Sequence, residues 1–289
     1  MNPLDNILRA CADYYNGTPT ISDAEYDAMV EDFAKKMPRL YDQWRASYIG
    51  PQPAHATPHP FRMLSLRGNG FDRFAEFAEW LSLMPKKAGV YLVQPKIDGH
   101  AVAITYTAGH LTRVATRGDG TMGKDITGLV LKNKLLPAVL PAESPTPLHL
   151  TGEIYVPLDE WNSTEFSHPR NELCSVMNGH SSPRRSVLKI MIHGVQGWTG
   201  DTFAKSEFEV YAYLGGRLGL PCVPSFELEP RVLVQRFGET LHAYLDHYRK
   251  TLPVDGLVVK VNDLALRRRI GESAVAPIWA YALKEYQNY

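Results

Sequence analysis

The sequence predicts an α+β fold in which mainly antiparallel sheets with flanking helices follow a small helical subdomain. Short runs of β-branched and aromatic residues recur beyond residue 60, and tight turns such as 107–110 join them. Residues 1 to about 48 show only helical periodicity, and four prolines among residues 50–60 indicate an extended link. We therefore expect two units, a helical subdomain with its linker at 1–60 and a larger domain at 61–289.

Two helices are expected in the subdomain. Pro3 suits a first helical position, and apolar residues follow at helical spacing to about Tyr15. Ser22 and Glu25 form a capping box ahead of a second periodic run that ends near Lys36.

Six strands and two helical stretches are expected in the larger domain. The strands are short apolar runs rich in β-branched and aromatic residues. They lie at residues 90–95, 101–106, 111–117, 148–157, 188–195 and 255–261, and the helical stretches lie at 71–84 and 230–249.

Composition excludes several classes of protein. The 31 basic and 31 acidic residues cancel, so any contact with nucleic acid requires a local patch. Cys11, Cys174 and Cys222 are too few for a disulfide framework or a four-cysteine zinc site, so no zinc is expected in this chain. Neither a signal peptide nor a membrane span is recognisable, which favours a cytoplasmic protein without a membrane partner.

Charged residues interrupt the predicted strands at several points. Lys96, Asp98 and Gly99 form a K-x-D-G motif that, taken alone, is as consistent with an Asp-Gly turn as with a site. The glycine-rich stretch 114–128 is either an exposed hairpin loop or a phosphate-binding loop. If residues 91–117 form a hairpin, Arg117 lies two strands from Lys96 at the same sheet end.

Further charges at strand ends strengthen the case for a site. Glu153, Asp255, Lys260 and Lys284 each lie in or beside an apolar run. For each lysine taken singly, a surface residue that reaches solvent is the simpler interpretation, whereas Glu153 needs either a sheet edge or a polar group to meet it. Together they predict a phosphate-handling pocket. Using a lysine as a nucleophile near neutral pH costs about 4 kcal/mol, and we expect Lys260, Lys284 and a bound Mg²⁺ to depress the pKa of Lys96.

In this order the motifs resemble those of the covalent nucleotidyltransferases, and specifically the adenylation region of the NAD⁺-dependent DNA ligases. "PKIDG" is similar to the nucleophile motif, "ATRGDGTMGKDIT" to the signature loop, and "GEIYVP", "DGLVVK" and "WAYALK" to later nucleotide-binding motifs. "MLSL" and "HPRN" also fit the family. The resemblance covers nearly the whole chain and implies the nucleotidyltransferase (ATP-grasp-like ligase) fold.

The resemblance implies a role for each matching residue. Lys96 would attack the α-phosphate of NAD⁺ to form lysine-AMP and release nicotinamide mononucleotide. Asp98, Glu153, Lys260 and Lys284 would be catalytic, and Asp255 with Glu153 would hold Mg²⁺. The nicotinamide mononucleotide half would be bound by Tyr14, Tyr15, Asp23, Tyr26 and Asp27, and the AMP half by Ser65, Leu66, Gln94, Arg117, Arg170 and His193.

Three positions depart from the family pattern. Gln94 stands where a glutamate usually precedes the nucleophile, and His193 stands where an aromatic ring usually stacks on adenine. Arg249 is a softer match, because its spacing to "VDG" is shorter than usual.

The expected partner is nicked double-stranded DNA, in replication and repair. In the family, an oligonucleotide-binding barrel, a zinc module, a helix-hairpin-helix domain and a BRCT domain follow the point where this sequence stops. Two expectations stay open: an excised adenylation fragment, or a natural short subunit that works with a second chain, as in some two-subunit phage ligases. The expected setting is a bacterial cytoplasm, with a phage-encoded origin open.

Two other functions are weighed against this one. The first is an RNA ligase or capping-type enzyme on the same fold, against which the intact "DAEYD" helix argues. The second is a non-catalytic NAD⁺-binding module, against which the presence of every lysine argues.

Overall fold

The computed structural model describes residues 3–15, 20–41, 56–70, 73–178, 188–197, 204–235, 237–274 and 276–285. The side chains of Tyr14, Tyr15, Asp23 and Asp27 lie outside the described part, although the backbone of their helices is described. The roles expected of these four residues therefore stay predictions.

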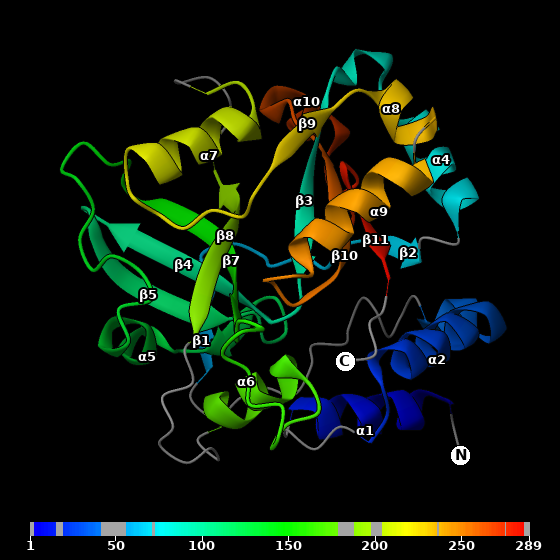
Figure 1. The fold of residues 1–289 in the computed structure, drawn as a ribbon, viewed down its shortest axis with the longest axis horizontal. Coiled ribbons are helices and arrows are strands. Elements are labelled where there is room, and N and C mark those ends of the chain that lie inside the picture. The colour runs from blue at the N-terminus through cyan, green and yellow to red at the C-terminus, as the bar shows by residue number, and fades with distance from the viewer. Residues whose placement is uncertain are drawn as a thin grey trace.

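Two helices begin the described chain, and strands interspersed with further helices follow, as Figure 1 shows. The helices are α1 (Pro3–Tyr15), α2 (Asp23–Lys36), α4 (Phe74–Leu83), η1 (Lys86–Ala88), α5 (Thr127–Lys132), α6 (Pro169–Met177), α7 (Glu207–Gly216), α8 (Pro230–Gln235), α9 (Phe237–Tyr248) and α10 (Leu264–Ile270). The strands are β1 (Ala56–Pro58), β2 (Gly68–Gly70), β3 (Tyr91–Ile97), β4 (His100–Thr107), β5 (His110–Thr116), β6 (Met122–Lys124), β7 (Leu148–Tyr155), β8 (Lys189–Gln196), β9 (Phe226–Leu228), β10 (Val254–Val261) and β11 (Ala280–Lys284).

The two predicted N-terminal helices are confirmed as α1 and α2. The capping box is present, since Ser22 Oγ accepts from the Glu25 backbone N–H and the Glu25 carboxylate accepts from the Ser22 N–H at 2.7 Å. Ile7 and Phe33 are buried between the helices, and Tyr26 packs against them. This small unit therefore has its own apolar contact surface.

Three sheets make up the rest of the fold. The five-stranded sheet has the order β2-β11-β10-β3-β9, the four-stranded sheet the order β5-β4-β7-β8, and β1 pairs with β6. Every pairing is antiparallel except β11 with β2, as predicted for the class. The six predicted strands are confirmed, the helical stretch at 71–84 is α4, and that at 230–249 is the pair α8 and α9.

Residues 91–117 do not form one hairpin, so the condition under which Arg117 would lie two strands from Lys96 is not met. β3 pairs with β10 and β9, whereas β4 pairs with β5 and β7, so the chain passes from one sheet to the other at Asp98 and Gly99. A glycine allows this crossing because a Cβ at Gly99 would lie 2.2 Å from the carbonyl oxygen of Ile154 on β7. Lys96 and Arg117 consequently belong to different sheets.

Each large sheet has its own apolar layer. The outer face of the five-stranded sheet packs against α4, α8 and α9, and α5, α6 and α7 contribute to the core of the four-stranded sheet. Leu92 of β3 packs in the core of the four-stranded sheet. The face of the five-stranded sheet that carries Leu92 is therefore directed toward the four-stranded sheet, and it is called the inner face below. No helix within the described residues is long and apolar enough to cross a membrane.

Residues 56–58, which the sequence placed in the linker, form β1 and pair with β6 in the signature loop. The short strands β2, β6 and β9 and the helices α5, α6, α7 and α10 were not predicted. The boundary at residue 60 stays a prediction.

Candidate functional site

Three strands place the predicted lysines on one face of the five-stranded sheet. Lys96 on β3 lies opposite Gly256 on β10, which lies opposite Lys284 on β11. Lys260 lies opposite Leu92, which precedes Lys96 by four residues on β3. Four residues of a strand span about 13 Å, so Lys260 lies that far from the Lys96 position along the sheet. Since directly opposed residues point to the same face, all three lysines share the face toward the four-stranded sheet.

Gly256 is needed in this row because the strands approach closely there. Its φ is +157°, and a Cβ would lie 2.0 Å from the carbonyl oxygen of Leu283 on β11. Any side chain would separate β10 from β11 and displace both neighbouring lysines. The glycine of the "DG" motif therefore has a structural reason.

Lys96 forms an ion pair with Asp255, with 2.6 Å between Nζ and Oδ2. The carboxylates of Asp98 and Glu153 also act on its charge, so these four predicted residues lie close together. Burial lowers the pKa of Lys96, but Asp255, then Asp98 and Glu153, outweigh burial and raise it well above its ordinary value. The depression expected from Lys260 and Lys284 is not found among the described residues, because carboxylates rather than the other lysines surround the amine. The part expected from a bound Mg²⁺ stays a prediction.

Asp98 is the most enclosed member of this cluster, with 6% of the residue exposed. Arg170 Nη1 donates to Asp98 Oδ1 at 2.8 Å, and His168 Nε2 lies 3.5 Å from Oδ2. His168 also caps α6, where its Nδ1 accepts from the Arg170 N–H, so the ring proton resides on Nε2. Burial, opposed by Asp255, lowers the pKa of His168 to about 4, which leaves the ring neutral near pH 7.

His168 was not predicted as a site residue. The signal was present in "HPRN", where a polar residue before a proline marks a helix start. Its contact with Asp98 depends on the fold, since 70 residues separate the two in sequence.

The signature loop contributes Arg117 beside the start of β4. Arg117 Nη1 donates to Ser65 Oγ at 3.4 Å, and the Met63 N–H donates to the Gly120 carbonyl at 2.9 Å. The structure therefore joins Met63 and Ser65 of the "MLSL" segment to the loop, whereas Leu66 is 37% exposed. Burial, with Arg117 adding to it, lowers the pKa of His100 to about 4.

Gln94 lies in the next row of the same sheet face, opposite Val258. It is 1% exposed, and its Nε2 donates to Ser225 Oγ at 2.8 Å, while Ser225 Oγ donates to the carbonyl of Val223. These contacts fix the amide orientation. Gln94 Oε1 is buried and accepts no hydrogen bond from the described residues, which leaves an acceptor for a ligand.

His193 occupies a bulge on β8. The register shifts between Thr151 and Gly152 of β7, which pair with Gly194 and Ile192, so His193 itself has no partner residue in the ladder. Its Nε2 lies 3.6 Å from Glu153 Oε2, which answers the expectation that a polar group meets this strand carboxylate. Its backbone carbonyl accepts from Lys260 Nζ at 2.6 Å.

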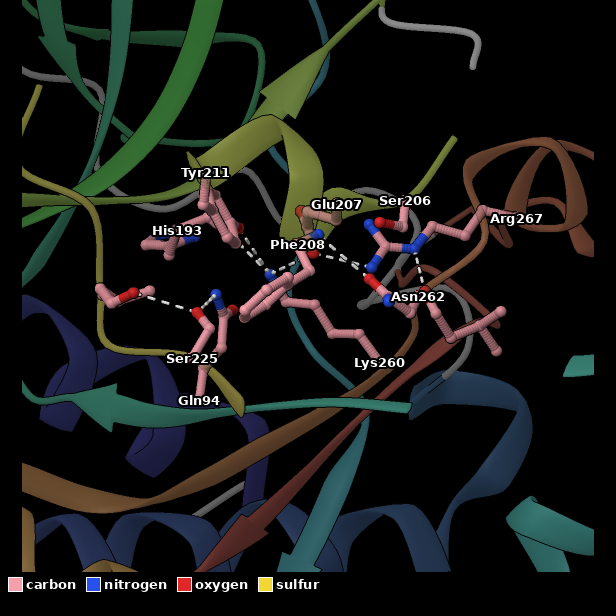
Figure 2. Close-up of polar contacts among 12 residues, drawn as sticks. Gln94, His193, Ser206, Glu207, Phe208, Tyr211, Ser225, Lys260, Asn262 and Arg267 are labelled. Atoms are coloured by element: carbon pink, nitrogen blue, oxygen red, sulfur yellow. Dashed lines mark hydrogen bonds and ion pairs between the residues drawn. The ribbon is translucent and has the colours of Figure 1, made fainter. Parts of the chain in front are cut away.

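The structure does not bring Lys260 to Lys96. Its ammonium contacts the His193 carbonyl and faces Glu207, as Figure 2 shows, and 3.4 Å separate Nζ from Glu207 Oε2. The expected contribution of Lys260 to the Lys96 environment is therefore not found, because the β10 register separates them. Burial, with Arg267 adding and Glu207 opposing, lowers the pKa of Lys260 to about 8.

Arg249 contacts the residue that follows β11, whose N–H donates to the Asp255 carbonyl. It pairs with Glu285, the residue after Lys284, at 2.9 Å from both the carboxylate and the backbone carbonyl. Its direct contribution is to hold the end of β11.

Oxygen donors suited to a magnesium ion are present at Asp255 and Glu153. Asp255 Oδ1 is buried and makes no hydrogen bond with the described residues, while Oδ2 is held by Lys96. Among the residues described, no group of three or more His, Cys, Asp or Glu side chains could hold a metal. A bound Mg²⁺ would therefore depend on phosphate or water oxygens for most of its coordination, as is usual for this ion.

The family described as NAD-dependent DNA ligase adenylation domain matches residues 53–287. A DNA ligase of Frankia casuarinae is 33% identical over 299 residues, which cover 94% of this chain and 41% of that protein. DNA ligase 1 of Pseudarthrobacter chlorophenolicus is 32% identical over 307 residues, which cover 94% of this chain and 38% of that protein. The chain thus spans about two fifths of the length of these relatives.

Solved structures give a weaker likeness. An archaeal ATP-dependent RNA ligase superposes with a TM-score of 0.45 at 14% identity, over 78% of this chain and 48% of that chain. A putative ATP-dependent DNA ligase from Aquifex aeolicus gives 0.38 at 12% identity, over 79% and 49%. Scores this low carry no argument about function.

Proposed function

This chain belongs to the NAD-dependent DNA ligase adenylation-domain family, and from that premise we propose that it transfers AMP from NAD⁺ to its own Lys96. One observation carries the proposal: the amine of Lys96 lies among Asp98, Glu153 and Asp255, near the end of β3 on the inner face of the five-stranded sheet. A lysine that only snorkels to solvent has no need of such partners. A lysine nucleophile does, because the carboxylates hold its amine in place and offer an acceptor for the proton that must leave before attack. Since the same carboxylates raise the pKa of Lys96, a bound Mg²⁺ that draws on Asp255 and Glu153 would favour the loss of this proton.

Asp255 is the proposed proton acceptor, since its Oδ2 lies 2.6 Å from Lys96 Nζ. The freed amine then forms a nitrogen–phosphorus bond with the α-phosphate of NAD⁺. The bond from this phosphorus to the bridging oxygen breaks, and its electron pair leaves with nicotinamide mononucleotide. The product on the enzyme is a lysine-AMP phosphoramidate.

Cationic groups at the same end would stabilise the phosphates. Arg170 and Arg117 approach Asp98 and Ser65, and Lys284 lies in the row of Lys96, so the three can surround a phosphate or ribose there. Mg²⁺, held by Asp255 and Glu153, would neutralise charge on the α-phosphate. Tyr14, Tyr15, Asp23, Tyr26 and Asp27 are proposed, from the resemblance alone, to bind the nicotinamide mononucleotide half.

The adenine is proposed to bind between the sheets, near Gln94 and His193. The unused acceptor Gln94 Oε1 suits the exocyclic amino group of adenine. The His193 ring, which is 35% exposed, offers a stacking surface. Lys260 lies at this end instead of the phosphate end.

In the complete reaction, AMP is proposed to pass from Lys96 to the 5′-phosphate of a nick in double-stranded DNA, where the 3′-hydroxyl displaces it. Because the chain spans about two fifths of its relatives, this step is proposed to use a further DNA-binding region or a second subunit.

Intact-protein mass spectrometry tests the proposal. The protein is incubated with Mg²⁺ and either NAD⁺ or ATP, and a mass increase of one AMP is expected with NAD⁺ only. Lys96→Ala should abolish the increase, whereas Lys189→Ala, an exposed lysine on β8, should retain it. An adduct formed only with ATP would support an ATP-dependent nucleotidyltransferase instead, and no adduct with either would overturn the proposal.

A further inference from the structure

A buried charge network lies behind the adenine end of the proposed site. Glu207 is the first residue of α7 and is 2% exposed. Its Oε2 accepts from Arg267 Nη2 at 2.7 Å and lies 3.4 Å from Lys260 Nζ. Figure 2 shows the Lys260 ammonium between Glu207 and Tyr211 on one side and Gln94 and His193 on the other.

Helix capping does not account for Glu207. The capping box of α7 uses Ser206 and Glu209, whose carboxylate accepts from the backbone N–H groups of Lys205 and Ser206. Glu209 is exposed, whereas Glu207 points inward. Two acidic residues in one helical turn thus have separate roles, and that of Glu207 concerns the interior.

Lys260 depends on Glu207 more than Arg267 does. The Arg267 guanidinium also donates to the Val261 carbonyl and stacks 4.3 Å from the ring centroid of Trp279. Within the described part of the chain, Glu207 is the one carboxylate paired with Lys260, whose other partners are the His193 carbonyl and the Tyr211 hydroxyl at 3.5 Å. Without Glu207, two buried cations would face each other, which favours a neutral or displaced Lys260.

Lys260 links the two large sheets. It projects from β10 of the five-stranded sheet and donates to the bulge carbonyl of His193 on β8 of the four-stranded sheet. Loss of this contact frees the bulge that carries the His193 ring and removes the cation beside Tyr211 and Gln94. The position of Lys260 therefore sets the geometry of the adenine end.

We propose that Glu207 is a positioning residue that holds the Lys260 ammonium against the His193 bulge and so keeps the adenine end of the nucleotide pocket in its binding geometry. The inference rests on the proposed function, and it adds a residue that contacts no nucleotide. Its effect should fall on binding of the adenine nucleotide and much less on the chemistry at Lys96, about 13 Å away along the sheet.

The test measures two quantities for each variant: single-turnover adenylation across a range of NAD⁺ concentrations, and AMP affinity by calorimetry. Glu207→Gln is expected to raise the KM for NAD⁺ and the Kd for AMP at least about tenfold, with kcat reduced less than about threefold, because a charge-assisted contact is lost at the binding end only. Glu209→Gln, on the same helical turn, should leave all three within about twofold. Circular dichroism checks that each variant is folded.

Further variants separate positioning from simple loss of packing. Glu207→Asp keeps the charge on a shorter side chain and should give an intermediate KM, and it replaces Glu207→Gln in the test if the latter does not fold. In a Lys260→Met background, Glu207→Gln should add little further increase in KM, because Glu207 acts through Lys260.

The outcomes distinguish this inference from the proposed function. If the wild type forms the NAD⁺ adduct but Glu207→Gln matches it in KM and Kd, or if kcat falls as much as KM rises, the positioning role is overturned and the function stands. If the wild type forms no adduct but binds AMP more tightly than Glu207→Gln, the function falls and the positioning role stands. If the wild type neither forms an adduct nor binds AMP, both are overturned.

Discussion

Glu207 should make the stability of the fold depend on pH in an acid window. Burial alone would raise the pKa of Glu207, but Arg267 and Lys260 outweigh it and lower the pKa from 4.5 to about 2. Because the folded-state pKa is the lower one, the contribution is fully present above about pH 4.5 and is lost as the pH falls toward 2. A shift of this size corresponds to about 3 kcal/mol of unfolding free energy.

The perturbation is Glu207→Gln, and the assay is urea unfolding at a series of pH values between neutral and about 2. At neutral pH the variant should be less stable by at least about 3 kcal/mol, because the buried Lys260 and Arg267 lose their carboxylate. The difference from the wild type should shrink as the pH falls through the window. Glu209→Gln, which removes a fully exposed carboxylate, should change the curve far less.

A stability difference between wild type and Glu207→Gln that stays constant from neutral pH to about 2 would refute this reasoning. It would mean that Glu207 is not selectively stabilised in its ionised form by the two cations.

Three further predictions concern other parts of the fold. Gly256→Ala should lower the free energy of urea unfolding by about 2 to 4 kcal/mol and reduce adenylation, because the new Cβ meets the Leu283 carbonyl. Gly216→Ala should be nearly neutral, because open space surrounds that glycine. Equal effects of the two substitutions would contradict the close approach of β10 and β11. Arg170→Met should lower the free energy of urea unfolding by about 3 kcal/mol, because it removes a partner of the buried Asp98 carboxylate. Adding Asp98→Asn should restore part of that free energy, because no unpaired charge is then buried. No recovery in the double variant would argue against a charge effect. Deleting residues 1–55 removes α1 and α2 but keeps β1. Mass spectrometry should then find no AMP adduct with NAD⁺, while calorimetry should still find cooperative unfolding. An undiminished adduct would contradict the role proposed for these two helices.

The long strands were predictable because each contains six or more positions over which apolar residues alternate with polar ones or β-branched residues cluster. The three-residue strands β1, β2, β6 and β9 were not, since such short segments are extended only because a partner strand binds them. Helix α7 was overlooked although Ser206 and Glu209 repeat the capping signal of Ser22 and Glu25. Aromatic and glycine residues within α7 hid its helical character.

The candidate site was predictable as a set of residue types, because a charge in an apolar strand needs a partner. Lys96, Asp98, Glu153 and Asp255 do lie together. The place of Lys260 was not predictable, because it depends on the pairing register of β10 with β3. The network around Glu207 was equally hidden, since its members come from β10, α7 and α10, which only the folded chain brings together.

AMP is proposed to become attached to Lys96, and peptide mapping after incubation with NAD⁺ and Mg²⁺ locates the attachment. Trypsin normally cuts after Lys96 and after Arg113, whereas an adenylated lysine resists cleavage. Attachment at Lys96 should give one uncut peptide, residues 88–113, that is heavier by one AMP and is missing without NAD⁺. AMP found on any other peptide, with residues 88–96 released normally, would contradict it.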